Sequence, residues 1–145
     1  MKLTKNQKKE ISKMAKKYGL KLVLLFGSFS SGKIHEGSDY DIAVLTEESK
    51  NISNLKNYNN ILFFLSEVLE IPSQKIDLTN LNNANPLLCY EITMKGKLVF
   101  ADRNLFDEHR ARSFRNYIDS QPLFNLEHHL IEKRNQMLKQ LILKQ

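Results

Sequence analysis

Two short apolar runs, each joined to a particular polar pair, constrain most strongly what this chain can fold into. The first run, residues 22–26, ends at Gly27-Ser28, and the second, residues 42–45, follows Asp39-Tyr40-Asp41. Both runs have the length and composition of buried strands. Side chains two residues apart in a strand point to the same face, so Asp39 and Asp41 are expected to present two carboxylates side by side.

Two adjacent carboxylates repel each other and raise at least one pKa unless a cation lies between them. Oxygen ligands with open coordination positions suit Mg²⁺ bound to a nucleoside triphosphate. Gly27 allows the backbone to come close to a phosphate, and a helix that starts there would add N–H donors beside Ser28. Asp-x-Asp alone is common at exposed strand starts. Combined with Gly-Ser ten residues earlier, it predicts a nucleotide site made by Gly27, Ser28, Asp39 and Asp41.

A third acid, Asp77, lies between Ile76 and Leu78 in a short strand-like run and is expected to face away from both. Alone, it could equally be an acid on a solvated strand edge. Beside Asp39 and Asp41 it is expected to help hold a second metal ion and to accept a proton from the nucleophile. Asp39, Asp41 and Asp77 are therefore the predicted catalytic and metal-binding residues, with two Mg²⁺ ions.

Length and charge narrow the class of protein. The 145 residues suffice for one domain with a real core. No apolar run approaches the roughly 20 residues of a membrane span, the N-terminus has no signal-peptide core, and the single Cys89 rules out an internal disulfide. These features predict a cytoplasmic protein without membrane contact. The net charge of +6 is concentrated in six lysines of residues 5–17, which lack interleaved aromatics and indicate a solvated helix face rather than a nucleic-acid surface.

Periodicity and capping residues predict the order of elements. Thr4 and Gln7 form a capping-box pattern, Asn85-Pro86 marks a second helix start, and Gly19 and Gly96 mark helix ends. The expected strands are residues 21–26, 39–46, 75–79 and 97–100, and the expected helices are residues 5–18, 29–33, 55–69, 86–95, 103–120 and 122–144, with Pro122 as a break. This alternation predicts an α/β or α+β fold with helices packed on a sheet.

Other motifs in the chain allow competing interpretations. Residues 27–33 match the start of a P-loop, but Ile34 stands where the Mg²⁺-binding Ser or Thr is required. Arg103 and His109 have the spacing of the HEPN ribonuclease pair, which arises often by chance.

The four histidines show no metal-binding spacing with a cysteine and are interpreted as surface residues, and Cys89 as a core residue. An apolar stripe near the C-terminus either packs within the molecule or docks a partner: Leu123, Leu126, Leu130, Met137 and Leu141.

The chain resembles the minimal nucleotidyltransferases of the polymerase-β superfamily. The resemblance is carried by residues 24–32, 37–44 and 75–81, by 85–88 with Glu91, and by 96–99, and it covers about residues 5–120. It implies a small mixed β-sheet flanked by helices that binds Mg·ATP, with a catalytic core at about residues 5–102 and a C-terminal helical extension at about 103–145. Asp39, Asp41 and Asp77 would correspond to the metal ligands, and Gly27 and Ser28 to the residues that hold the terminal phosphates.

Members of this family of similar size often look like antitoxins that transfer AMP from ATP to a tyrosine of a HEPN ribonuclease toxin. The resemblance therefore implies a type VII-like antitoxin and a hetero-oligomer with a HEPN-domain toxin. Two alternatives remain open on the sequence: a nucleotidyltransferase that modifies a small hydroxyl-bearing molecule, and an antitoxin that neutralises its partner by binding alone.

Overall fold

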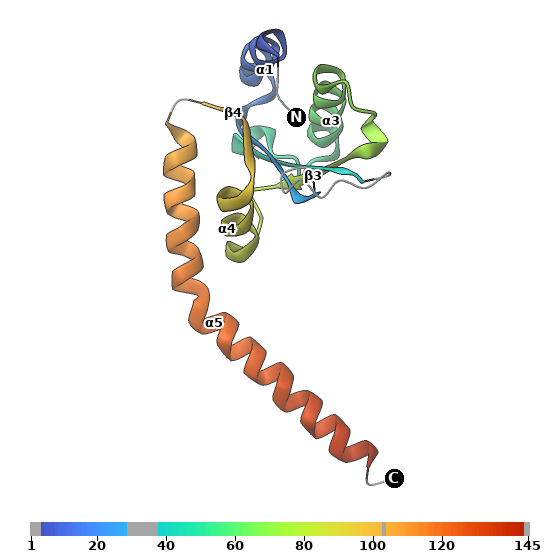
Figure 1. Ribbon diagram of the computed structural model, residues 1–145, viewed down its shortest axis with the longest axis vertical. Helices are drawn as coiled ribbons and strands as arrows, with labels where there is room; N and C mark the ends of the chain where they lie inside the picture. The colour runs from blue at the N-terminus through green and yellow to red at the C-terminus, as the bar shows by residue number, and fades with distance from the viewer. Residues whose placement is uncertain (1–3, 29–37, 103, 144–145) are drawn as a thin grey trace.

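A four-stranded mixed β-sheet forms the centre of the molecule (Figure 1). The computed structural model describes residues 4–28, 38–102 and 104–143. The strands are β1 (Leu20–Phe26), β2 (Tyr40–Thr46), β3 (Ile76–Asn80) and β4 (Lys97–Ala101), in the order β3-β2-β1-β4. β1 runs antiparallel to β2 and β4, whereas β2 and β3 are parallel. The end of β1 and the starts of the other three strands therefore meet at one edge.

Two hydrophobic clusters cover the two faces of this sheet. Helices α1 (Lys5–Tyr18) and α3 (Leu55–Leu69) pack on one face, where Val23, Ile42 and Val44 are fully buried. Helix α4 (Pro86–Lys95) and the first half of α5 (Leu105–Ile142) pack on the other face, against Leu22, Leu24 and Ala43. The alternation of these side chains along β1 and β2 explains why both runs are continuously apolar: each strand is buried on both faces.

The predicted helix signals are confirmed. Thr4 and Gln7 form a complete capping box, and Gly19 ends α1 in the left-handed conformation with φ 61°. Asn85 caps α4 through a side-chain bond from the Leu88 N–H, and Pro86 is its first residue. Short 3₁₀ helices, Glu48–Lys50 and Ser73–Lys75, lie in the connections on either side of α3.

The prediction of two C-terminal helices is wrong. One helix, α5, runs from Leu105 to Ile142 with Pro122 inside it. Proline removes one backbone donor and crowds the preceding turn, which kinks a helix without necessarily ending it. Figure 1 shows that α5 changes direction part-way along its length. Its first half stays on the sheet, and its second half extends away from it.

One predicted segment cannot be compared with the structure. The helical turns expected at residues 29–33 lie outside the described residues. Within the described part of the chain, no helix has the length and apolar character needed to cross a membrane.

Candidate active site

The three predicted aspartates lie at the edge where β1 ends and β2 and β3 begin. Asp41 and Asp77 are directly paired in the parallel register of β2 and β3, which places their Cα atoms about 5 Å apart. Asp77 is exposed between buried Ile76 and Leu78, as the sequence predicts. By strand alternation Asp41 and Asp77 share the face that carries Ala43, and Asp39, two residues before Asp41, continues that side.

The electrostatics of Asp41 show that the three carboxylates interact. Partial burial raises the pKa of Asp41, and the negative charges of Asp77 and then Asp39 raise it further, whereas a backbone hydrogen bond lowers it. Repulsion among ionised carboxylates is relieved most effectively by a cation placed between them. The donor set therefore fits a hard divalent cation, because all three ligands offer oxygen.

Gly27 makes room for Asp41 at the end of β1. It has φ 66°, a conformation that residues with a Cβ adopt only with strain. A Cβ added to Gly27 would overlap the carboxylate of Asp41. The backbone of Gly27-Ser28 and the Asp41 carboxylate therefore approach each other only because residue 27 has no side chain. This is the geometry expected where a loop must bring backbone donors next to a metal-bound phosphate.

Protein ligands alone do not enclose a metal here. Among residues 4–28, 38–102 and 104–143, no group of three or more His, Cys, Asp or Glu side chains is placed so that it could hold a metal ion. Mg²⁺ is commonly bound by one or two carboxylates, with water and substrate phosphates completing its coordination. The arrangement matches a site that the nucleotide itself completes.

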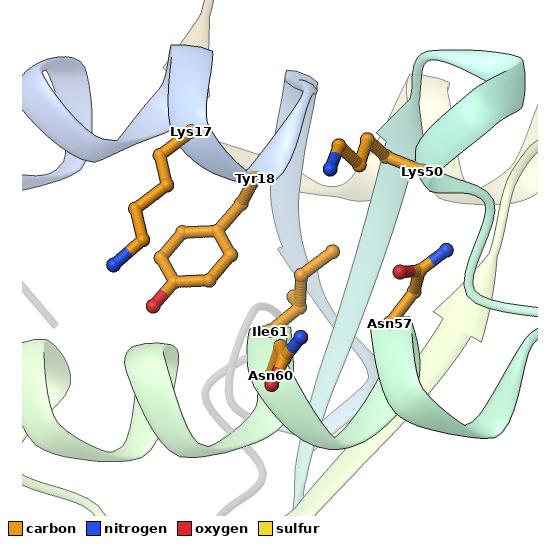
Figure 2. A pocket seen from close by; sticks show the side chains of 6 residues that line it. All are labelled: Lys17, Tyr18, Lys50, Asn57, Asn60 and Ile61. Carbon is orange, nitrogen blue, oxygen red and sulfur yellow. The ribbon is translucent and has the colours of Figure 1, made fainter.

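A cavity of about 170 Å³ lies between α1 and α3, at the opposite end of β1 from the aspartates (Figure 2). Tyr18 lines this cavity and stacks on Phe64 with ring centroids 4.9 Å apart. Lys17, Lys50 and Asn60 line it with exposed side chains. None of the three aspartates contributes to this cavity, so it is separate from the candidate active site.

The structure tests the remaining predicted residues. Cys89 is half-buried and packs beside the cluster of Leu22 and Leu24, as predicted, and burial raises its pKa. His128 and His129 are exposed, as predicted, and His35 lies outside the described residues.

The prediction for His109 is wrong, because it is buried with Ser113 one turn further along α5. Its Nε2 has no hydrogen-bond partner among the described residues. Burial, and then the charge of Arg112, lowers the pKa of His109. A buried helix face formed by polar residue types leaves no apolar periodicity in the sequence, which is why the pattern missed it.

The six N-terminal lysines, at residues 5, 8, 9, 13, 16 and 17, are all exposed.

Comparison with known proteins gives the family. The model of the family described as "Polymerase beta, Nucleotidyltransferase" matches residues 9–104. The chain belongs to this family. The match spans β1, β2 and β3, and therefore includes Gly27, Asp39, Asp41 and Asp77. The match favours a nucleotidyltransferase over the Arg103/His109 interpretation as a HEPN ribonuclease; Arg103 lies outside the described residues.

Two curated relatives of this nucleotidyltransferase are each named "Protein adenylyltransferase MntA". The one from Aphanizomenon flos-aquae is 36% identical over 100 residues, covering 64% of this chain and 65% of that protein. The one from Shewanella oneidensis is 32% identical over 81 residues, covering 56% and 54%. The aligned part is thus less than two thirds of the length of either relative.

Solved structures share the fold of this nucleotidyltransferase. A toxin–antitoxin structure with AMP-PNP matches 93% of this chain and 98% of that chain, at a TM-score of 0.56 and 23% identity. A tri-AMPylated Shewanella oneidensis HEPN toxin in complex with its MNT antitoxin matches 94% and 97%, at a TM-score of 0.51 and 21% identity. At these identities the likeness establishes the common fold.

Proposed function

We propose that this protein is an antitoxin that transfers AMP from ATP to a tyrosine of a HEPN-domain toxin and so blocks the toxin. The observation that carries the proposal is the pairing of Asp41 with Asp77 across two strands, with Asp39 on the same side and Gly27 making room for Asp41. The names of the two curated relatives support the AMP transfer. The complex of an AMPylated HEPN toxin with its MNT antitoxin supports the partner.

In this proposal Asp39, Asp41 and Asp77 hold Mg²⁺ together with the triphosphate, with two ions. When bound, Mg²⁺ would neutralise charge on the reacting phosphate and on the leaving pyrophosphate. Gly27 and Ser28 hold the terminal phosphates, through backbone N–H donors and the hydroxyl. Asp77, which is exposed, accepts the proton of the attacking tyrosine hydroxyl.

The acceptor tyrosine is proposed to come from the partner protein. The site is at an edge of the sheet, and Asp39 and Asp77 are exposed there. A side chain presented by another protein can therefore reach the carboxylates. We assign residues 5–102 as the catalytic core and α5 as an extension, and we place the reaction in the cytoplasm, where ATP is supplied.

The test is transfer to a purified HEPN-domain protein from the same genome, with ATP and Mg²⁺, followed by intact mass spectrometry. The proposal expects increments of AMP with the wild-type chain and none with Asp41→Asn. Asp119→Asn is the matched control, because it removes one exposed carboxylate on α5 and should leave transfer unchanged.

Two outcomes would contradict the proposal. If both the wild type and Asp41→Asn neutralise the toxin without adding mass, the protein acts by binding alone. If AMP appears only on an added small hydroxyl compound and never on the HEPN protein, the acceptor class is wrong while the nucleotidyl transfer is right.

A further inference from the structure

The second half of α5 leaves an apolar face uncovered. Every residue from 125 to 143 is exposed, and Figure 1 shows this part of the helix extending away from the sheet. Leu126, Leu130 and Ile131 are 54%, 55% and 51% exposed. With 100° per residue, the large apolar side chains between Leu123 and Ile142 fall within one half of the helix surface. We call this surface, centred on Leu130 and Ile131, the distal face.

Packing among the described residues does not cover this face. The first half of α5 packs on α4 and the sheet: Tyr117 stacks on Tyr90 with ring centroids 4.3 Å apart, and Phe124 contacts Tyr117. Beyond Phe124, no residue of α5 is buried or half-buried within the described chain. The alternative that the C-terminal apolar stripe packs intramolecularly is therefore not seen in this structure.

Two opposite charges lie in the middle of the distal face. Glu127 and Arg134 line a groove of about 330 Å³ together with Leu123, Leu126, Leu130 and Ile131. They are seven residues apart, which is two turns or about 10.5 Å along the helix. Neither forms an ion pair with any residue that the structure describes. Any partner that covers this face must supply an opposite charge to each, because burying an unpaired charge is strongly destabilising.

We propose that the distal face pairs with the same face of a second copy of this chain, with the two helices antiparallel. An antiparallel pair with its two-fold axis between Leu130 and Ile131 places Glu127 level with the partner's Arg134. The symmetry repeats the same pair on the other side, as in any isologous interface. Leu130 is then level with the partner's Ile131, so apolar side chains fill the centre between two ion pairs.

This charge pattern is what favours a second copy over other occupants. A lipid surface or a purely apolar peptide would leave Glu127 and Arg134 unpaired. An unrelated helix would need an acid and a base at the same two-turn spacing and in the reverse order. The antiparallel copy meets both conditions through its own sequence, and burial of its leucine and isoleucine side chains supplies the attraction.

The test uses the full chain alone, without nucleotide or toxin, in sedimentation equilibrium over a concentration series up to roughly the millimolar range. The proposal expects a monomer–dimer equilibrium for the wild type. Glu127→Arg gives a face with two basic groups, and Arg134→Glu gives a face with two acidic groups. Each variant alone should self-associate at least about tenfold more weakly.

Sedimentation of a mixture of the two variants is the decisive experiment. In the mixed antiparallel pair each arginine again faces a glutamate, so heterodimers should form with near wild-type affinity. Glu132→Arg and Lys139→Glu are the matched controls, because these exposed residues have the same spacing on the opposite side of α5. Both controls should dimerise like the wild type, and circular dichroism should show equal helix content in all variants.

Several results would overturn the proposal: a wild-type chain that stays monomeric throughout, a mixture of the two variants that does not recover association, or controls that weaken association as much as the distal-face variants. If the distal face binds only the HEPN-domain toxin, the chain alone would stay monomeric in this experiment. Glu127→Arg would then disrupt the complex of the chain with the toxin.

Discussion

Replacing Gly27 with alanine should separate the two roles of this residue, its backbone conformation and the room that it leaves for Asp41. Gly27 has φ 66°, and an added Cβ would overlap the Asp41 carboxylate. The left-handed conformation costs an alanine about 1–2 kcal/mol. Because the added Cβ overlaps the carboxylate, Asp41 must also move, and a displacement of about 1 Å at a reacting group can lower a rate about 100-fold.

Gly19→Ala is the control for the backbone strain. Gly19 has nearly the same conformation, φ 61°, but its Cβ would meet Lys50 Cγ and Cβ at 2.7 and 2.9 Å, so that Lys50 must shift, at the far end of β1 from the aspartates. Both variants should therefore lose about 1–2 kcal/mol, which lowers the melting temperature by roughly 3–8 °C in a chain of this size. Only Gly27→Ala should also lose AMP transfer.

The assay is a thermal melt of each variant, together with the initial rate of AMP incorporation into the HEPN-domain protein, measured well below both melting temperatures. Equal melting temperatures with a loss of about 100-fold in rate for Gly27→Ala alone would agree with the reasoning. If Gly27→Ala keeps the wild-type rate, or if Gly19→Ala loses as much activity, the contact between Gly27 and Asp41 does not position the carboxylate.

Three further predictions concern stability. Asp41→Asn should raise the melting temperature at neutral pH without metal, because it removes the repulsion from the other two carboxylates; the gain should be only roughly 1–3 °C, since solvent screens that repulsion. Because the pKa of Asp41 is raised from 3.8, the gain should vanish as the pH falls through that raised pKa. A gain that stays constant down to pH 3 would refute this cause. His109→Phe should add about 1 kcal/mol by removing the unpartnered Nε2. Because the pKa of His109 is lowered, the wild type loses stability as the pH falls below about 6.5. His109→Phe should therefore be less sensitive to acid than the wild type in urea titrations. Equal acid sensitivity of the two proteins would contradict the burial of His109 as a neutral imidazole. Glu70→Gly should stabilise the end of α3 by about 1 kcal/mol, since Glu70 has φ 56°, and a lower midpoint in urea would show that its side chain makes a compensating contact.

The sequence predicts this fold well where local signals agree with tertiary packing. The capping box at Thr4 and the Asn85-Pro86 start are complete local motifs, and both appear in the structure. The strands β1 and β2 are predicted because both of their faces are buried and the runs are therefore apolar throughout. The pairing of Asp41 with Asp77 follows from the parallel register of β2 and β3. The order of elements predicts the fold class but not this register.

Pro122 and His109 show where sequence reasoning stops. Pro122 lies inside one continuous helix rather than ending it, although α5 changes direction part-way along its length (Figure 1). His109 is buried by the packing of α5 on the rest of the molecule, so its environment depends on contacts far apart in the chain. Neither outcome can be read from a window of neighbouring residues, because each is decided by tertiary contacts or by the balance of helix propagation.

In the proposed reaction, the three aspartates support attack on the α-phosphorus of ATP. The most direct measurement compares ATP labelled at the α-phosphorus with ATP labelled at the γ-phosphorus, using the HEPN-domain protein as acceptor and either the wild-type chain or Asp41→Asn. The α label is expected to enter the acceptor with the wild type only, while γ label leaves with pyrophosphate. Entry of γ label into the acceptor, or equal α label with Asp41→Asn, would contradict the proposed reaction.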